Sequence, residues 1–121
     1  MILVDTSVWV SHLRKGNSYL VSLLNDGDVA CCPFIIGELS CGNLKNRREI
    51  LSLLSSLPEA VQANHEEVMQ FVENHNLMGS GIGYIDAHLL ASAVLSGISI
   101  WTLDKKLRAA ALKLGVCADD S

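Results

Sequence analysis

The sequence predicts a single α/β domain in which a central, mainly parallel sheet is covered by helices on both faces, as a three-layer α/β/α sandwich. Short apolar strands alternate with helical segments along the chain, which is typical of parallel sheets. The 121 residues suit one domain, residues 1–121, and half of them are hydrophobic, enough to build a core. No repeat, low-complexity tract or linker divides the chain.

Strand and helix signals alternate in the first half of the chain. Short branched apolar runs predict buried strands, whereas apolar residues three or four apart predict helices. Asp26-Gly27-Asp28 is a turn signal, Pro33 suits the first turn of a helix, and Leu57-Pro58 breaks one. The expected elements are a strand at 2–4, a helix from Asp5 or Thr6 to about Arg14, a helix at 18–25, a strand at 29–32, a helix from Pro33 that carries Glu38, and a helix at 46–56.

The second half contains the most apolar helix and the best strand. A continuous apolar segment beginning at Tyr84 predicts a helix buried on most sides, which Gly97 ends. The glycines between 79 and 83 lack the strand and the Lys-Ser/Thr pair of a phosphate loop, so we expect a connector. The expected elements are a short edge strand at 60–63, helices at 65–76 and 84–96, a strand at 98–103, and a helix from the cap Asp104 to about Leu114.

Four acids stand where an apolar strand runs into a helix or shortly after that point. They are Asp5, Glu38, Asp86 and Asp104. Because the carboxyl ends of parallel strands lie along one edge of a sheet, acids far apart in the chain can converge there. Carboxylate oxygens are the ligands that Mg²⁺ and Mn²⁺ prefer. The pattern therefore predicts a divalent metal site suited to chemistry on phosphate.

Helix capping is the alternative explanation for each acid taken singly. Asp5 and Asp104 stand where N-caps belong, and we expect Asp86 and Glu38 in the first turns of their helices, where the helix dipole favours negative charge and lowers carboxyl pKa values. Capping does not require charge, however, and two carboxylates ~4 Å apart repel by about 4 kcal/mol at an effective dielectric of about 20. A fold that gathers four of them needs a cation.

The charge distribution indicates a polyanionic partner in spite of a net charge of −4. The nine lysines and arginines fall in three groups, each on or just beyond a helix that follows one of the acids. Such a basic rim suits a nucleic-acid backbone, although cations are also favoured at helix C-termini. The basic residues expected to contact that backbone are Arg14, Lys15, Lys105, Lys106 and Arg108.

The motifs around the four acids resemble the PIN-domain family, in particular the small ribonucleases of VapC-like toxin–antitoxin pairs. The resemblance covers essentially the whole chain, from Met-Ile-Leu-Val-Asp-Thr-Ser at its start to Thr-Leu-Asp at 102–104. It implies that the matching acids Asp5, Glu38, Asp86 and Asp104 are both the catalytic residues and the metal ligands. It also implies an RNA substrate, a small protein antitoxin, and a homodimer.

We expect a Mg²⁺-dependent endoribonuclease, with Mn²⁺ able to substitute, that hydrolyses RNA phosphodiester bonds by metal-activated water. Asp5 and Asp104 are expected to hold the main ion, and Asp86 and Glu38 to complete the site directly or through water. The hydroxyls of Ser7 and Thr102 are expected to orient carboxylates, although either could bond its own backbone instead. No apolar run is long enough to span a membrane, and no signal peptide is recognised, so we expect a cytoplasmic protein.

Other residues and other folds are less well supported. His88 lies two residues after Asp86, an offset that faces away on a helix, so we expect a partly buried, hydrogen-bonded histidine. The aromatic residues are scattered, which gives little support for base stacking, and the four cysteines lack metal-site spacing. A non-catalytic PIN-like scaffold remains an alternative. A receiver-type phosphoacceptor domain is disfavoured because no Asp lies between Asp28 and Asp86.

Overall fold

A three-stranded parallel sheet lies at the centre of the computed structural model, which describes residues 1–118. The strands are β1 (Ile2–Val4), β2 (Val29–Ala30) and β3 (Ser99–Trp101), in the order β2-β1-β3. Ile2 pairs with Val29 on one side and with Ser99 on the other, and Val4 pairs with Trp101. Because β1 is the central strand, the residue that follows it, Asp5, stands in the middle of the carboxyl edge.

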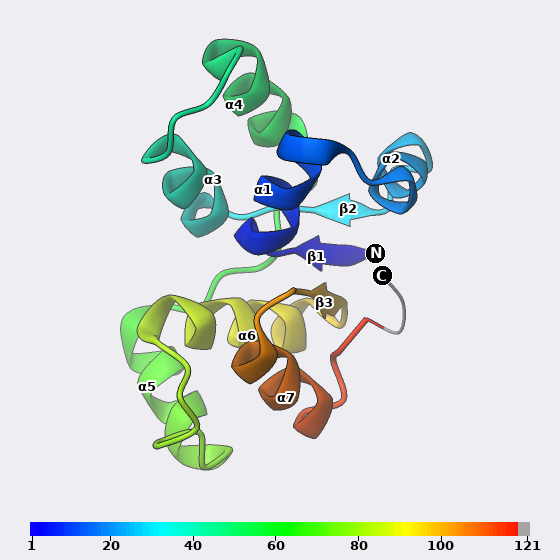
Figure 1. Ribbon diagram of the computed structural model, residues 1–121. Coiled ribbons are helices and arrows are strands. Elements are labelled where there is room, and N and C mark those ends of the chain that lie inside the picture. Colours follow the sequence, from blue (N-terminus) through cyan, green and yellow to red (C-terminus); the bar gives the residue numbers. More distant parts are fainter. Residues whose placement is uncertain (119–121) are drawn as a thin grey trace.

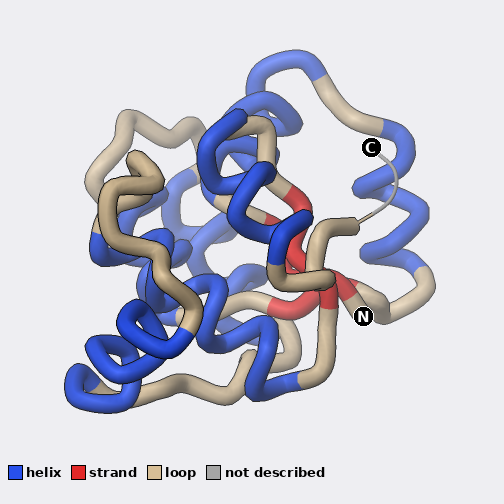
Figure 2. Tube along the Cα trace, turned by 90° about the horizontal axis from the view of Figure 1, so that it is seen from below, coloured by secondary structure: helices blue, strands red, loops and turns tan. Residues whose placement is uncertain are grey.

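Seven helices surround these strands in the described part of the chain. Figure 1 shows α1 to α4 on one side of β1 and α5 to α7 on the other, and the view turned by 90° shows the strands at the centre (Figure 2). The predicted α/β sandwich is confirmed. The helices are α1 (Thr6–Lys15), α2 (Ser18–Asn25), α3 (Pro33–Ser40), α4 (Arg47–Ser56), α5 (His65–Asn74), α6 (Tyr84–Ser96) and α7 (Lys105–Lys113).

The core explains why the strands can be so short. Leu3 and Val4 of β1 and Ile100 of β3 are fully buried, and each such aliphatic side chain contributes roughly 1.5–3 kcal/mol on burial. In α6 every residue from 87 to 93 is buried, as the continuous apolar segment predicts. Trp9 and Trp101 are also core residues. These contacts hold the carboxyl edge of the sheet rigid.

The predicted edge strand at 60–63 is wrong. The chain pairs with the sheet one step earlier, through a single parallel bridge between Glu59 and Cys31. The amide of Val61 then donates to Ser96 Oγ (2.8 Å), which draws the chain away from β2 before a strand can form. At the other edge of the sheet, a bridge between Ile100 and Cys117 adds a second short pairing.

Helix boundaries follow the predictions closely, and the largest difference is at the end of α5. The helix expected at 65–76 ends at Asn74, because Asn76 adopts a left-handed φ of 53° that stops it. In α1, Val8 and Trp9 are buried, whereas Leu13 is 38% exposed. The exposed side of Leu13 lines a surface hollow.

Burial separates the cysteines into two kinds. Cys31 and Cys32 are buried, whereas Cys41 is exposed, and these three and Cys117 are all free thiols. Burial raises the pKa of the Cys31 thiol to about 11, which keeps it protonated and unreactive at neutral pH. None of the helices in residues 1–118 is both long and apolar enough to cross a membrane.

Candidate functional site

Two hydroxyl groups tie the loop after β3 to Asp5 at the end of β1. Thr102 Oγ1 donates to Asp5 Oδ2 (2.7 Å), and Ser7 Oγ donates to the same oxygen (2.8 Å). Ser7 Oγ in turn accepts from the Leu103 amide (3.0 Å). Asp5 is only 7% exposed, so these bonds fix one of its oxygens and the direction of its carboxylate. Ser7 and Thr102 therefore both hydrogen-bond the Asp5 carboxylate.

The side chain of Asp5 accepts no capping hydrogen bond from a backbone amide of α1, so the capping explanation is wrong for this residue. It is correct for Asp104, whose Oδ1 accepts from the amides of Lys106 (2.9 Å) and Leu107 (3.0 Å). The Asp104 amide itself donates to Thr102 Oγ1 (3.0 Å). One threonine hydroxyl thus connects Asp5 with the backbone of Asp104.

Glu38 reaches the same edge from a different part of its helix than expected. It lies in the second half of α3 and not in the first turn, since Pro33 begins that helix. Its Oε1 accepts a hydrogen bond from Thr6 Oγ1 (2.8 Å), and Thr6 directly follows Asp5. The contact between α1 and α3 therefore places Glu38 beside the end of β1, although its side chain is exposed.

The other three acids affect the pKa of Asp86. It lies in the first turn of α6, where its Oδ2 accepts from the Gly83 amide (3.2 Å). Burial raises the pKa of this carboxyl above its ordinary value, the Gly83 hydrogen bond opposes that change, and the charges of Asp5, Asp104 and Glu38 raise it further. The lowered pKa expected from the helix dipole is thus wrong for Asp86, because desolvation and like charge outweigh the dipole. The four acids are close enough to interact electrostatically.

The four acids lie at one edge of the sheet, but their carboxylates do not surround a common metal position. Within residues 1–118, no three side chains of Asp, Glu, His or Cys are positioned to hold a common metal ion. The hydrogen bonds explain this, because Glu38 is turned to Thr6, Asp86 to Gly83, and Asp104 to the start of α7. The donor set consists of carboxylate oxygens alone, which fits a hard cation such as Mg²⁺.

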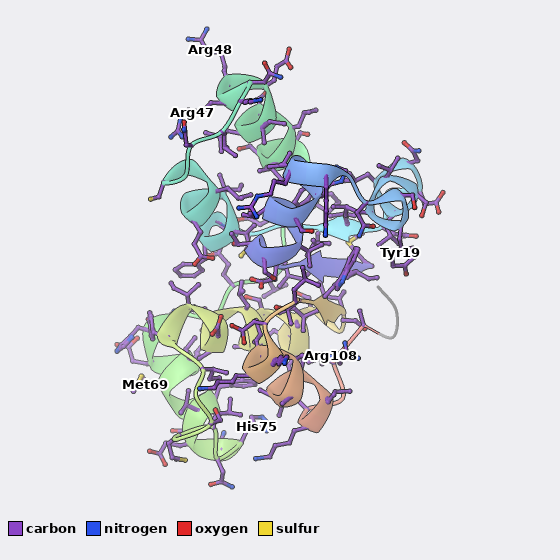
Figure 3. All side chains as sticks on the ribbon, in the orientation of Figure 1. Tyr19, Arg47, Arg48, Met69, His75 and Arg108 are labelled. Carbon is purple, nitrogen blue, oxygen red and sulfur yellow. The ribbon has the colours of Figure 1, made fainter. Side chains whose placement is uncertain are left out.

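The predicted basic residues differ in how close they stand to this edge. Lys105 and Lys106 begin α7, directly after Asp104. Arg14 and Lys15 lie at the far end of α1, about 15 Å along the helix from its start. Arg108 turns toward the C-terminal segment, where its Nη1 donates to Cys117 Sγ (3.4 Å; Figure 3). The two lysines of α7 are therefore the nearest to an acid along the chain.

The environment of His88 was predicted wrongly. The residue is buried, yet its Nδ1 has no hydrogen-bond partner among the described residues. Its ring lies between Phe34 of α3, at a centroid distance of 4.4 Å, and Tyr84, at 4.6 Å. Burial lowers the pKa of His88, and nearby His65 lowers it further, which favours the neutral ring. Aromatic residues that are scattered in the sequence thus meet in space.

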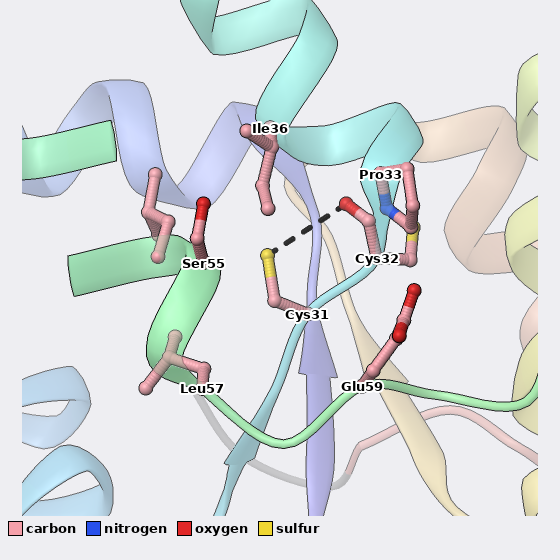
Figure 4. A pocket seen from close by; sticks show the side chains of 8 residues that line it. Cys31, Cys32, Pro33, Ile36, Ser55, Leu57 and Glu59 are labelled. Carbon is pink, nitrogen blue, oxygen red and sulfur yellow. Dashed lines mark hydrogen bonds between the residues drawn. The ribbon is translucent and has the colours of Figure 1, made fainter. Parts of the chain in front are cut away.

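Two surface hollows lie beside α3. The larger, about 680 Å³, runs between α1 and the segment that joins α3 to α4, and Glu38 lies on its wall with Val10, Leu13 and Arg14. The smaller, about 230 Å³, is lined by Cys31, Cys32 and Glu59 among others (Figure 4). None of the four acids lines the smaller hollow, so it is separate from the candidate site.

The chain is similar to known proteins over most of its length. The family model described as PIN domain matches residues 2–113. Ribonuclease VapC32 of Mycobacterium tuberculosis, from the CDC 1551 and H37Rv strains, is 45% identical over 117 residues, which cover 96% of this chain and 94% of the relative. The crystal structure of PAE2754 from Pyrobaculum aerophilum matches with a TM-score of 0.62 at 20% identity, over 90% of this chain and 78% of that one.

Proposed function

This chain belongs to the PIN-domain family, and we propose that it is a Mg²⁺-dependent endoribonuclease, the toxin of a toxin–antitoxin pair. The observation that carries the proposal is the meeting of four acids from remote parts of the chain at one edge of the sheet. The pKa of Asp86 is raised first by burial and then by the charges of the other three acids. The 45% identity to a protein named as a ribonuclease supports RNA as the substrate. A purely structural scaffold has no use for such a cluster of like charges.

Asp5 and Asp104 are the residues that would hold the main ion, and Asp86 and Glu38 would complete the site. Bound Mg²⁺ supplies a water nucleophile at neutral pH and neutralises charge on the phosphate, and Mn²⁺ can substitute for it. The chain's own contribution is orientation. Thr102 and Ser7 hold one oxygen of Asp5, which leaves its other oxygen available for a cation.

RNA cleavage that depends on divalent metal tests the proposal. The purified protein is expected to cut single-stranded RNA internally with Mg²⁺ or Mn²⁺, and to stop when EDTA is added. Product lengths on a sequencing gel distinguish internal cuts from trimming at the ends. Cleavage that continues at full rate in EDTA would contradict a role for metal.

Lys106 is the basic residue we propose to contact an RNA phosphate next to the site. Its side chain lies against Gly81, so closely that a Cβ built on Gly81 would meet Lys106 Cδ at 2.5 Å. Gly81 belongs to the loop that leads to Asp86, and Lys106 follows Asp104 by two residues. The lysine therefore bridges the segments that carry two of the acids.

Gly81→Ala is expected to displace Lys106 and weaken RNA binding. Gly79→Ala is the matched control, because Gly79 has a similar positive φ (75° against 87°) but nothing within 4 Å of the added methyl group. Both variants suffer backbone strain, and only Gly81→Ala moves the lysine. Binding measured against salt should show a slope smaller by about 0.7 for Gly81→Ala and Lys106→Gln, as expected for one lost phosphate contact to a single strand. Equal slopes for the two alanine variants would rule out the contact.

The larger hollow is the surface we propose for the antitoxin. Its apolar wall includes Val10 and Leu13, which are 41% and 38% exposed on α1. Glu38 lines the same hollow, so an apolar helix lying in it comes against the acidic edge and blocks access to it. Because the hollow reaches Glu38, a bound antitoxin would inhibit the ribonuclease simply by blocking RNA from the acids.

Val10→Asp is expected to weaken binding of the proposed antitoxin by about tenfold or more, because it places a charge in an apolar contact. Val21→Asp is the matched control, since Val21 is 44% exposed on α2 and does not line the hollow. Equal loss in both variants would argue against this surface. The homodimer and the cytoplasmic location stay predictions. Light scattering tests the first, and cell fractionation tests the second.

A further inference from the structure

Rings from three helices meet where α3, α5 and α6 come together. His88 of α6 lies between Phe34 of α3 and Tyr84, at centroid distances of 4.4 and 4.6 Å. Tyr84 also faces the ring of His65 of α5 (5.6 Å), and its hydroxyl is 2.8 Å from His65 Nδ1. The four rings form a continuous group, which we call the ring cluster: Phe34, His65, Tyr84 and His88.

Tyr84 is fixed by contacts within the ring cluster and is also exposed to solvent. Its ring stands edge-on to His88 at 84°, and the contact with His65 fixes its far end. Even so, Tyr84 is 46% exposed, whereas His88 beneath it is 5% exposed. An aromatic ring with little freedom and a large open surface loses little entropy when a flat ligand stacks on it.

The acids lie next to the ring cluster. Tyr84 directly follows Gly83, and the amide of Gly83 donates to the carboxylate of Asp86 (3.2 Å). On α3, Phe34 precedes Glu38 by one turn, so both lie on the same face of that helix. Phe34 thus joins the ring cluster to the face of α3 that carries Glu38, and Tyr84 directly follows the glycine whose amide binds Asp86.

We propose that Tyr84 is a stacking platform for one unpaired base of the RNA substrate, supported from below by His88 and Phe34. The inference rests on the proposed ribonuclease activity and adds the subsite next to the cut. Sequence-tolerant stacking on an aromatic ring is a common way to hold single-stranded RNA, because every base has a flat face. In a duplex those faces are stacked against neighbouring bases, so the platform selects unpaired RNA.

A scan of RNA substrates with one base removed at a time tests the platform. In the wild-type protein, an abasic nucleotide at one position near the cut is expected to raise KM about tenfold, with little change in kcat. Tyr84→Leu is expected to raise KM about as much with intact RNA, and to be indifferent to the same abasic position. Tyr84→Phe keeps the ring and should stay within about twofold of wild type.

Tyr19→Leu is the matched control. Tyr19 is 38% exposed and also packs on an aromatic ring, that of Trp101 (5.4 Å), but it belongs to α2, on the side of the molecule opposite α3 (Figure 3). Its loss should leave KM and the abasic profile unchanged. Thermal melts confirm that each variant is folded. If Tyr84→Leu does not fold, a wild-type profile without a sensitive position would still reject the platform.

Two outcomes would overturn the platform. A wild-type protein that cleaves RNA with no position sensitive to base removal has no stacking subsite, and the proposed activity would stand without it. Tyr84→Leu that keeps the wild-type abasic profile would assign the sensitive position to another residue. A protein that neither binds nor cleaves RNA would remove the proposed function and the platform together.

Discussion

Asp5→Asn is expected to reduce RNA cleavage by more than about 100-fold, since loss of a group that merely supports a metal ligand costs roughly 10–100-fold and Asp5 is proposed as a ligand itself. The fold should survive. Asparagine keeps an oxygen that can accept from Ser7 and Thr102, and the substitution removes one of the charges that raise the pKa of Asp86. In metal-free buffer the melting temperature is therefore expected to be unchanged or higher.

The same variant should lose the stabilisation that Mg²⁺ gives to the wild-type protein, because a ligand that binds only the folded state raises its stability. Thermal melts with and without Mg²⁺ measure this directly. Asp28→Asn is the control, since Asp28 precedes β2 and so lies at the opposite edge of the sheet. Cleavage at the wild-type rate would remove Asp5 from the reaction, and an unchanged response to Mg²⁺ would remove it from the metal site.

Thr102→Val is expected to impair both stability and cleavage. Thr102 is 4% exposed, and its hydroxyl serves the Asp5 carboxylate and the Asp104 amide at once. Valine has the same shape but leaves both groups short of a partner in a buried place, at a cost of about 1–3 kcal/mol in the free energy of unfolding. The carboxylate is then less firmly oriented, so cleavage should fall by roughly 10–100-fold.

Thr102→Ser separates the hydroxyl from the shape of the side chain, because it keeps the oxygen and loses only a methyl group. It should retain most of the activity and lose less stability than Thr102→Val. Urea unfolding gives the stability difference, and kcat at saturating Mg²⁺ gives the effect on the reaction. If the valine variant were as active as the serine variant, the link between Asp5 and Asp104 would be structural only.

Local chemistry of the chain was enough to place most elements. Ile2–Val4, Ser18–Asn25 and Tyr84–Ser96 have the predicted boundaries, and Lys105 begins a helix because Asp104 caps it. In these segments apolar spacing, caps and turn residues all favour the same structure, so neighbours in the sequence decide the outcome. The order of acids along such a pattern also indicated a shared edge, because parallel strands end on the same side.

Long-range contacts decided the rest. The strand expected at 60–63 failed because Ser96 binds Val61, and Glu38 reached the edge through Thr6 instead of through the first turn of its helix. The raised pKa of Asp86 comes first from burial and then from three acids far away in the sequence, and the ring cluster joins residues from three helices. Spacing along a chain reports which face of one element a residue occupies, whereas its partners across the fold depend on how elements pack.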